Sequence, residues 1–540
     1  MKIGIIGGGF AGIATARVFD ECGYDVVVYE KERDIGGVWS SSRRYPGLTT
    51  QNNKCTYYLS ELEFPNNYPE WPTGRQVQEY FELYIDKFDL GRLIHTGSDV
   101  IDANFDVQKN IWRLTIRDSS ESTEASLREA EVDYLIVCNG IFSIPFVPDY
   151  PGAEAFRAAG GSLLHTSEFT DKTAGTGKHV VVTGYGKSSC DVATAMVGVS
   201  KSTTVVARNL LWKIPKKLLG VLNYKYLFLT RMGEGLFPYI RLEGFEKFLH
   251  SRVGRPIRNF LMGSVERVIS SQLRLRKLGL HPNKPLETIA RSTVSLVTEG
   301  FYEAVGNGDI RLIKGAQIDE LMPGKAILST GETIPADVVI CGTGWDQQAS
   351  FLDPSVAKKI VDEDGNFRLY RSMIPVDTPN LAFNGYNSSF FSQLNCEIGA
   401  LWLLSYLNGG HQLPSREDQN AHIDRRLAWM IERTDGKHSK GTNIIPFSMH
   451  NIDELLDDMG MNLGRFAKLC QWLGPVKPSS YRHILPELTA RLLQRPFKRP
   501  IQPPLCGDSS SIGLLSEPIS CLHTNWLRLR GFGNLEIQLN

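Results

Sequence analysis

The chain has 540 residues, of which 42% are hydrophobic, and its 59 basic side chains equal its 59 acidic ones in number. The hydrophobic fraction excludes a chain that is disordered throughout, and the length predicts roughly three to four domains, or two large ones with insertions. Zero net charge gives no electrostatic reason to expect nucleic acid or an acidic membrane as the main partner. We therefore expect small-molecule partners and no nucleic acid.

The first residues run directly into a glycine turn, which is typical of a buried first strand and not of a secretory signal. No stretch of about 18 residues is both apolar and free of charge, so we expect no membrane span. The apolar stretch 218–240 is interrupted by charges, and we interpret it as a packed helical insertion, with a membrane-surface segment or an apolar substrate entrance as alternatives. The nine cysteines form no Cys-x-x-Cys pair, so we expect no metal site and a cytoplasmic protein.

The hydrophobic pattern predicts an α/β chain in which a strand–glycine turn–helix–strand unit occurs twice, at 1–30 and at 179–208. Between these units we expect a helix over 76–88 and then antiparallel strands and an apolar strand over 95–138. A helical stretch over 209–300 follows the second unit. Further on, the pattern predicts strands over 310–345 and helices over 395–408, 416–433 and 451–473.

The first glycine turn contains Gly7, Gly9 and Gly12. In a dinucleotide-binding fold the first glycine allows a tight turn, the second lets the backbone approach a pyrophosphate, and the third lets helix and strand pack closely. The pyrophosphate then lies on free amide donors at the positive end of the helix. The second strand ends in Glu30, at the distance from Gly12 where an acid accepts hydrogen bonds from the hydroxyls of a ribose.

The segment Ile35-Gly36-Gly37-Val38-Trp39 extends this signal. A Gly-Gly pair shortly after the ribose acid, followed by Trp, is typical of the version of the fold that binds flavin adenine dinucleotide (FAD). Gly37 lets the chain pass close to the cofactor, and Val38 and Trp39 follow it. A plain turn with a core Trp is the alternative interpretation.

The second glycine turn contains Gly184 and Gly186, with Ser189 at the place of the third glycine. A small residue there still permits close packing of helix and strand. The strand that follows ends in Arg208 and carries no acid. Because an arginine pairs with a 2′-phosphate that an acid would repel, this site favours NADPH over NADH.

Two dinucleotide sites, flavin first and nicotinamide second, imply a flavoprotein whose FAD is reduced by NADPH. We expect two Rossmann-like dinucleotide-binding domains, the second lying within the first. The predicted segments are an FAD-binding domain in two parts (1–155 and 326–450), an NADPH-binding domain (156–325) that carries a helical insertion (209–300), a helical extension (451–495) and a poorly ordered tail (496–540).

Together these residues resemble the flavin-containing monooxygenases, over roughly residues 1–410. The family's fingerprint, Phe-x-Gly-x-x-x-His-x-x-x-Tyr/Phe, has counterparts in Gly161, His165 and Phe169. Phe156 lies upstream of the position of the leading Phe, which implies a short insertion. Phe169, where the Baeyer–Villiger branch prefers Trp, resembles the branch that oxygenates heteroatoms.

Further matches follow the same order as in the family. Ser188 and Asp191 resemble its Ser-x-x-Asp-Ile-Ala helix start, and Arg208 and Trp212 resemble its Arg and Trp after the next strand. Cys138-Asn139-Gly140 stands where an Ala-Thr-Gly is usual. Thr343 and Gly344, followed by Trp, resemble the late Ala-Thr-Gly-Tyr that marks the return to the flavin domain. The resemblance implies that His165, Thr343 and Gly344 contact a cofactor.

The segment Thr50-Gln51-Asn52-Asn53-Lys54 is the one that the resemblance places near the flavin ring. The family usually has Asn at the position of Gln51, and this Asn contacts both the flavin and the nicotinamide. Gln51 keeps the amide but is longer by one methylene, so either Gln51 or Asn52 is the catalytic amide. A polar turn that caps a helix at Lys54 is the alternative.

The resemblance implies that NADPH reduces FAD, that O2 then forms a C4a-(hydro)peroxyflavin, and that one oxygen atom passes to a nucleophilic nitrogen or sulfur of a small organic substrate. The cofactor carries this chemistry, and the protein supplies orientation, dryness and polar contacts. A helix that begins near Gln393 would direct its positive end at the flavin, although an ordinary buried helix fits its pattern over 396–406 equally well.

The substrate that we expect is a specialised metabolite, N-hydroxylated or N-oxidised. The alternatives are Baeyer–Villiger oxidation of a ketone, an NADPH oxidase that releases peroxide, and a non-catalytic flavin-binding interaction protein. A disulfide reductase is disfavoured because the chain has no redox cysteine pair. A homodimer is left open.

Overall fold

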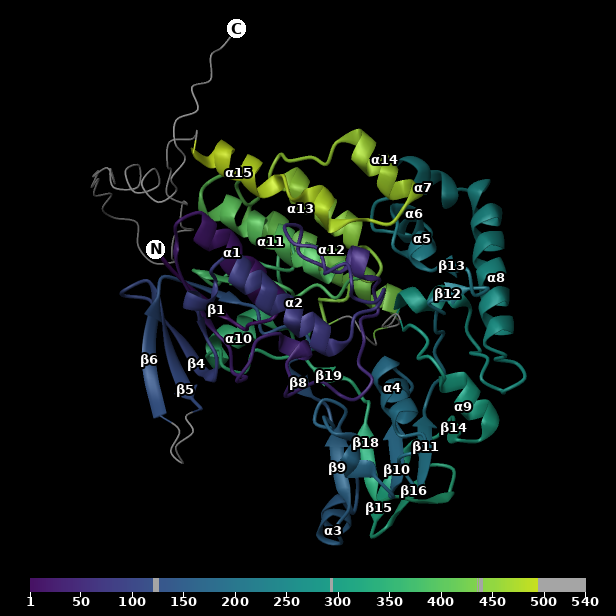
Figure 1. The fold of residues 1–540 in the computed structure, drawn as a ribbon. Coiled ribbons are helices and arrows are strands. Elements are labelled where there is room, and N and C mark those ends of the chain that lie inside the picture. Colours follow the sequence, from purple (N-terminus) through teal and green to yellow (C-terminus); the bar gives the residue numbers. More distant parts are fainter. Residues whose placement is uncertain (120–125, 292–294, 435, 437–439, 494–540) are drawn as a thin grey trace. The chain divides into compact units, whose positions relative to one another are not determined.

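The computed structural model describes residues 1–493 except 120–125, 292–294, 435 and 437–439. These residues belong to one compact unit. The tail expected at 496–540 lies outside the described residues. The arrangement is α/β with two parallel sheets, which confirms the predicted fold class (Figure 1).

The first sheet is parallel throughout and starts at the N-terminus. In spatial order its strands are β20 (Leu381–Phe383), β7 (Tyr134–Val137), β1 (Lys2–Ile6), β2 (Asp25–Tyr29) and β3 (Ile94–His95). The central strands are apolar without alternation because both faces of the sheet are covered.

Each face of this sheet has a different cover. Ile3 and Ile5 belong to the core beneath α1 (Phe10–Glu21) and α11 (Ser392–Leu407), which pack against each other. Ile6 and Val137 face an antiparallel meander, in which Trp112 is fully buried. The meander consists of β4 (Ser98–Asp106), β5 (Ile111–Asp118) and β6 (Ser126–Val132), as the alternating sequence predicts.

The second sheet is also parallel. In spatial order its strands are β14 (Ile310–Lys314), β11 (Ser202–Ala207), β10 (His179–Thr183), β18 (Val338–Cys341) and β9 (Ser162–His165). Because β18 pairs with β10 and β9, this sheet extends to Cys341. The expected boundary at 325 was therefore placed too early, because a strand that returns late in the chain is indistinguishable in sequence from a strand of the first sheet.

Helices cover one face of the second sheet, α4 (Lys187–Ala195) and α9 (Phe301–Asn307). The other face carries α3 (Ala153–Ala158) and a small antiparallel sheet of β15 (Ile318–Met322), β16 (Lys325–Leu328) and β17 (Thr333–Pro335). The chain enters this region through β8 (Ile144–Pro145) and leaves it through β19 (Trp345–Asp346). These two crossings pair with each other as antiparallel strands, which fixes the connection between the sheets.

The stretch after β11 contains helices, as expected, but more than half of its described residues lie outside them. It contains the hairpin β12 (Lys217–Leu218) and β13 (Leu222–Asn223), and the helices α5 (Lys225–Phe228), α6 (Arg231–Gly235), α7 (Gly244–Leu249) and α8 (Gly254–Gln272). Tyr224, Phe228 and Leu229 are buried in it, whereas Leu219, Val221 and Tyr226 are exposed, so the stretch 218–240 packs only in part. None of the helices in the described part of the chain is long and apolar enough to cross a membrane.

One further helix, α2 (Gly74–Lys87), precedes the meander in the chain, and α10 (Pro354–Ile360) precedes β20. The helices after α11 are α12 (Arg416–Thr434), α13 (Ser448–Asp458), α14 (Arg465–Leu473) and α15 (Ile484–Leu493). Thr73 and Gln76 form a capping box at the start of α2, which explains why this helix begins there. Helices α13 and α14 pack against α6, so the C-terminal extension lies on the insertion.

A buried ionic network joins the insertion to the extension. Arg231 of α6 makes a salt bridge to Asp453 of α13, with an N–O distance of 2.6 Å. His450 of α13 lies between two carboxylates, its Nδ1 2.5 Å from Glu234 and its Nε2 2.9 Å from Glu246. Burial by itself lowers the pKa of His450, but the bonds to Glu234 and Glu246 outweigh burial and raise the pKa to about 10. The imidazolium is therefore the form present at neutral pH.

The raised pKa predicts how the stability gained from His450 depends on pH. This contribution is fully present below the ordinary histidine pKa of about 6.5 and is lost as pH rises through about 10. We expect His450→Gln to lower the free energy of unfolding by about 3 kcal/mol at neutral pH, because it leaves buried carboxylates without their cation. Urea unfolding at neutral pH and above pH 10 measures both values, and the difference between variant and wild type should shrink at the higher pH.

The matched control is His483→Gln, because His483 is exposed. It should leave the unfolding free energy unchanged at both pH values. An equal loss for His450→Gln at both pH values would contradict the charged state assigned to His450.

Candidate functional site

The first glycine turn has the geometry that the sequence predicts. Gly7 has φ +111°, and a Cβ atom there would lie 2.6 Å from the carbonyl oxygen of Cys138. A Cβ atom on Gly12 would overlap the carbonyl oxygen of Gly7, so only glycine lets α1 start this close to β1. Gly9 is the N-cap of α1, and no side chain caps its amide groups. These amides are free to bind an anion.

A second glycine loop lies against this turn. The amide of Gly36 donates to the carbonyl of Gly8 (3.1 Å), and a Cβ atom on Gly37 would lie 3.4 Å from Cα of Gly9. Val38 and Trp39 continue the loop as the 3₁₀-helix η1 (Gly37–Trp39), and Trp39 is buried. Two backbone segments without side chains therefore pack directly against each other, and glycine permits this close approach beside the start of α1.

Glu30 lies at the end of β2, directly beside the glycine turn. Its side chain is 5% exposed, and its carboxylate accepts hydrogen bonds from the amides of Gly8 (2.5 Å) and Glu32 (2.9 Å). Burial raises the pKa of this carboxyl group. The two amides orient the carboxylate at the strand end where a ribose would lie.

The second glycine turn repeats this construction. Gly184 has φ +99°, and a Cβ atom on it would overlap the carbonyl oxygen of Gly342. Gly186 is the N-cap of α4, again without a capping side chain, and Ser188 lies half-buried in the first turn of this helix. Ser189, at the third-glycine position, donates to the carbonyl of Thr183 (3.3 Å). This hydrogen bond satisfies the hydroxyl within the turn and keeps α4 close to β10.

Positive charge gathers at the carboxyl edge of the second sheet. Arg208 follows β11, is exposed, and has no ion-pair partner within the described ranges. Lys314 ends the neighbouring strand β14, paired in register with Ala207. The insertion closes over this edge, since Lys314 Nζ donates to the carbonyl of Gly279 (2.7 Å) and the ring of Trp212 contacts His281. The sequence predicted Arg208 but not Lys314, whose position follows only from strand pairing.

Asp191 connects three parts of the chain. Its carboxylate, which is buried, pairs with Lys187 on α4 and accepts hydrogen bonds from Thr298 Oγ1 (2.5 Å) and the hydroxyl of Tyr45 (3.3 Å). Burial, and then the charge of Asp191, raise the pKa of Tyr45 well above its ordinary value. Asp191 thus ties the second glycine turn to the loop of the first domain that leads to Thr50.

The amide segment lies where the domains meet the insertion. The Oε1 atom of Gln51 accepts from the amide of Leu296 (3.1 Å), and its carbonyl accepts from the hydroxyl of Tyr224. Asn52 is buried, and its Nδ2 donates to the carbonyl of Phe390 (2.6 Å). Thr50 Oγ1 closes the turn by donating to the carbonyl of Asn52 (2.8 Å). The two candidate amides therefore point toward different partners, one to the insertion and one to the start of α11.

Helix α11 begins at Ser392, two residues after Phe390. No side chain caps its N-terminus, and Gln393 is buried with an Oε1 atom that has no hydrogen-bond partner in the described part of the chain. The positive end of a long buried helix thus lies next to Asn52. The helix predicted from residue 393 is present, and its position fits the hypothesis that it faces a flavin.

His165 and the late glycine segment lie together. His165 ends β9, and its ring contacts Trp345 edge-on at 4.7 Å between centroids. Its Nδ1 lies 2.9 Å from Ser167 Oγ, whereas its buried Nε2 has no partner in the described ranges. Burial lowers the pKa of His165. Thr343 donates to the carbonyl of Phe146 and so fastens the turn at Gly344.

The leading aromatic residue of the fingerprint keeps its contact despite its shifted position. Phe156 on α3 is fully buried, and its ring would overlap a Cβ atom on Gly161, at 2.5 Å. The extra residues form the end of α3, so the insertion in sequence leaves the ring packed on the glycine. Phe169 is also buried.

Sequence reasoning missed Lys213. This side chain is buried, donates to Ser295 Oγ (2.8 Å), and lies 4.8 Å above the ring of Tyr185 in the second glycine turn. Burial lowers the pKa of Lys213. A lysine within the apolar run Leu210-Leu211-Trp212-Lys213-Ile214 was the available signal.

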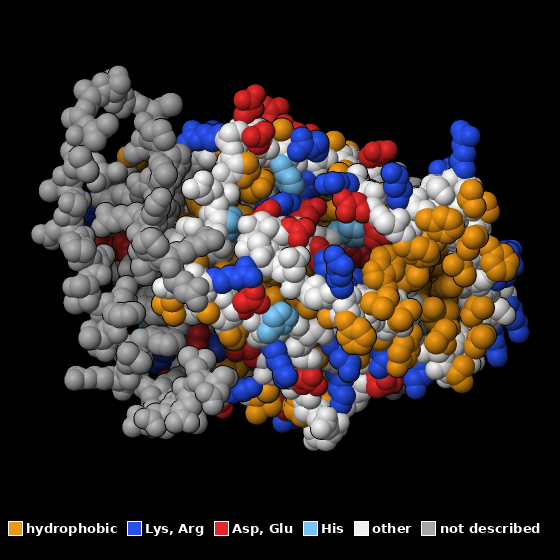
Figure 2. Space-filling view, turned by 90° about the horizontal axis from the view of Figure 1, so that it is seen from above, with side chains coloured by type: hydrophobic (Ala, Val, Ile, Leu, Met, Phe, Trp, Pro, Cys, Tyr) orange, Lys and Arg blue, Asp and Glu red, His pale blue; other side chains and the backbone are white. Residues whose placement is uncertain are grey.

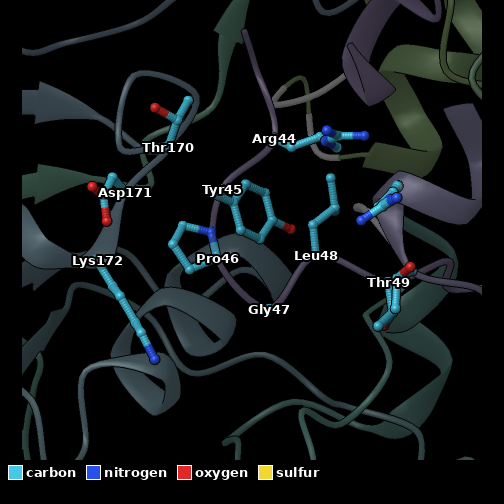
Figure 3. A pocket seen from close by; sticks show the side chains of 12 residues that line it. Arg44, Tyr45, Pro46, Gly47, Leu48, Thr49, Thr170, Asp171 and Lys172 are labelled. Carbon is cyan, nitrogen blue, oxygen red and sulfur yellow. The ribbon is translucent and has the colours of Figure 1, made fainter. Parts of the chain in front are cut away.

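An open pocket of about 440 Å³ is lined by residues 44–49, 73–75 and 170–172. Tyr45 and Pro46 lie between Thr170, Asp171 and Lys172 on one side and Arg44, Leu48 and Thr49 on the other (Figure 3). None of the predicted site residues lines this pocket. It is therefore distinct from the predicted cofactor and amide positions.

The two glycine turns, each leading into an uncapped helix, fit two dinucleotides, because both carry backbone cradles that a Cβ atom would fill. Fold and site together define a flavoprotein oxidoreductase with two dinucleotide sites. The chain belongs to the flavin-binding monooxygenase-like family, whose model matches residues 1–469. It is an FAD-dependent NADPH monooxygenase, as the sequence predicted.

Curated relatives match most of the chain. The probable flavin-containing monooxygenase 1 of Arabidopsis thaliana is 26% identical over 527 residues, which cover 89% of this chain and 96% of the relative. Flavin-containing monooxygenase 1 of Homo sapiens is 24% identical over 456 residues, covering 79% and 78%. The N-oxide-forming dimethylaniline monooxygenase 2 of Mus musculus is 24% identical over 490 residues, covering 86% and 82%.

Solved structures share the fold. The S-allyl-L-cysteine S-oxygenase of Allium sativum has a TM-score of 0.59 at 17% identity, and the match covers 91% of this chain and 98% of that one. Cyclohexanone monooxygenase from Rhodococcus sp. Phi1, bound to NADP+, has a TM-score of 0.61 at 17% identity, with coverage of 91% and 98%. These likenesses concern the fold alone.

The position of Glu30 yields a binding prediction. We expect Glu30→Gln to weaken FAD binding about tenfold to a hundredfold, because a charged hydrogen bond is worth roughly 1.5–3 kcal/mol and an amide offers one acceptor oxygen in place of two. Fluorescence titration of the apoprotein with FAD measures the change. Glu129→Gln, on an exposed carboxylate of β6, is the control and should bind FAD as wild type does. Unchanged affinity in Glu30→Gln would rule out the ribose contact.

The position of Arg208 after β11 yields a second binding prediction. We expect Arg208→Gln to raise the KM for NADPH about tenfold or more and to leave the KM for NADH unchanged, because a guanidinium–phosphate pair is a strong charged hydrogen bond. Steady-state oxidation of both nucleotides measures this. Arg157→Gln, an exposed arginine on α3, serves as the control. If the two KM values rise together in Arg208→Gln, the side chain does not read the 2′-phosphate.

Proposed function

We propose that this monooxygenase oxygenates a nucleophilic nitrogen or sulfur of a small organic substrate. The observation that carries the proposal is the junction at Gln51 and Asn52, where amides from the first domain meet the insertion and the start of α11. In the described residues this junction presents amides, hydroxyls and aromatic rings. Such a site positions reactants and excludes water, which is what a reaction borne by cofactors requires.

In this proposal FAD is held by Gly7, Gly9, Gly12, Glu30 and the loop Gly37-Val38-Trp39. NADPH is held by Gly184, Gly186, Ser188, Ser189 and Arg208, with Asp191 fixing the turn. When bound, NADPH supplies the hydride and FAD the activation of O2 and the transfer of one oxygen atom. His165, Thr343 and Gly344 line the crossing between the two sites.

The two amides have separate roles in the proposal. Asn52, held at the start of α11, would place its amide group at the flavin edge next to the positive helix end. Gln51 is held by Leu296 and would face the nicotinamide side. Tyr224 stacks on Trp71 at 6.4 Å between centroids, and this aromatic wall suits an apolar substrate.

Nitrogen or sulfur is favoured over a ketone carbonyl for two reasons. Phe169, where the Baeyer–Villiger branch prefers Trp, is buried in this chain. The names of relatives include an N-oxide-forming enzyme and an S-oxygenase. The likeness in fold to cyclohexanone monooxygenase keeps the ketone as the second candidate. We further propose a specialised metabolite as substrate, a cytoplasmic location and a homodimer, to be tested by localisation and sedimentation velocity.

A product assay tests the oxygenated atom. We expect the enzyme, supplied with NADPH and ¹⁸O2, to give N-oxidised or S-oxidised products from amines and thioethers, each with one labelled oxygen by mass spectrometry. Cyclic ketones offered under the same conditions should stay unchanged. Lactones as the main products would establish the Baeyer–Villiger reaction instead, and peroxide equal to the NADPH consumed with every substrate would establish an oxidase.

The amide variant locates the reaction within the site. Asn52→Leu should retain NADPH oxidation but release a larger share of the reducing equivalents as peroxide, because the amide that orients the flavin edge is gone. Asn67→Leu, the same change on an exposed asparagine, is the control. If Asn52→Leu releases no more peroxide per NADPH than Asn67→Leu does, and Gln51→Leu releases more, the catalytic amide is Gln51.

A further inference from the structure

An apolar surface lies on the insertion, away from the residues assigned to the cofactors. Helices α7 and α8 carry large apolar side chains on their outer faces, Phe245 and Phe248 on α7 and Ile257, Phe260 and Leu261 on α8. Phe260 is 66% exposed. The spacing of these residues puts them on one side of each helix, while the opposite side is buried.

Helix α14 of the C-terminal extension continues this surface. Phe466, Leu469 and Leu473 recur at helical spacing and are exposed, Leu473 at 79%. Trp472 on α14 contacts Phe245 on α7, with ring centroids 5.9 Å apart. Figure 2 shows the result as one broad orange area over this end of the described chain. We call the exposed apolar side chains of α7, α8 and α14 the apolar patch.

Positive charge surrounds the apolar patch. Lys247, Arg252, Arg255 and Arg465 are exposed, and none has an ion-pair partner within the described ranges. Of the acids on or next to these helices, Glu246 is buried against His450, Glu266 accepts a hydrogen bond from the amide of Leu286, and the exposed Glu243 pairs with Arg241. Blue side chains border the orange area in Figure 2. An apolar face flanked by cations is the composition of helices that lie in the headgroup region of a membrane.

A second copy of the chain fits this surface poorly. A two-fold interface brings the same patch from both copies together, and would therefore gather the cations of both copies around one interface. Solitary exposed apolar residues need no explanation, but a contiguous apolar area bordered by one sign of charge points to a partner of the opposite sign. An anionic surface satisfies both the apolar centre and the cationic rim.

We propose that the apolar patch docks on the surface of an anionic lipid bilayer, with the side chains of α7, α8 and α14 among the headgroups and the flanking lysine and arginines on the lipid phosphates. The contact is peripheral. It involves no part of the cofactor sites, so it holds whatever atom the enzyme oxygenates. The net charge of zero gave no indication of this contact, because composition does not show where the cations lie.

Vesicle sedimentation of the full-length, FAD-loaded protein tests the proposal. The vesicles consist of phosphatidylcholine alone or with one third phosphatidylserine. We expect binding to the anionic vesicles that weakens at high salt. The variant Ile257→Ser/Phe260→Ser/Leu473→Ser should bind the anionic vesicles at least about tenfold more weakly than wild type. The variant Lys247→Gln/Arg252→Gln/Arg255→Gln should lose the preference for phosphatidylserine.

A matched control removes equally exposed apolar groups elsewhere. Val107→Ser/Leu127→Ser alters the meander of the first domain and should bind as wild type does. FAD content and NADPH oxidation in the absence of vesicles should be the same in all variants, which shows that each one folds.

Three results would overturn the proposal. The wild type could stay in the supernatant with both kinds of vesicle. The apolar variant could bind like wild type, which would place the lipid contact in another part of the chain. Sedimentation velocity could show a dimer that the apolar variant converts to a monomer, which would make the apolar patch a contact between copies.

Discussion

The carboxylate of Asp191 is the interaction on which the geometry of the site depends. It lies in the helix after the second glycine turn, yet it is held by Tyr45 from the first domain and Thr298 from the end of the insertion. A buried carboxylate is costly to leave unpaired, and Lys187 on the same helix supplies its counter-charge. The hydrogen bonds from Tyr45 and Thr298 add contacts that join the first domain and the insertion to the second glycine turn. The resemblance indicated Asp191 as a cofactor residue, and its partners show that it also joins the domains.

The insertion contacts the candidate amide segment. Tyr224 reaches back to the carbonyl of Gln51, and the amide of Leu296, near the end of the insertion, donates to the side chain of the same residue. Residues far apart in sequence therefore determine how Gln51 points. The longer side chain of Gln51 reaches the backbone at Leu296, whereas Asn52 contacts the carbonyl of Phe390 just before α11. Substitutions in the insertion are expected to change coupling as well as substrate choice.

Local patterns in the sequence predicted the parts of the structure that obey local rules. The glycines of both turns, the acid at Glu30 and the start of α11 follow from chain geometry, and the structure has them where expected. The boundary at 325 failed because strand order is a long-range property, and β18 joins the second sheet only through its pairing with β10. Lys314 and Lys213 were missed for the same reason, since their neighbours come from strand pairing and from residues brought close by folding.

The ionic network bears on the charge of the apolar patch, because it holds an acid of α7 inside the protein. Glu234 and Glu246 turn inward to hold the imidazolium of His450, and Asp453 turns inward to hold Arg231. Glu234, Glu246 and Asp453 are thus paired within the protein, where a buried charge left without its partner is costly. Because these three acids point inward, they add no negative charge to the outer faces of α7, α8 and α14. Loss of the pair between Glu246 and His450 would free a carboxylate on α7, the helix that carries Lys247, and would weaken the attraction to an anionic partner.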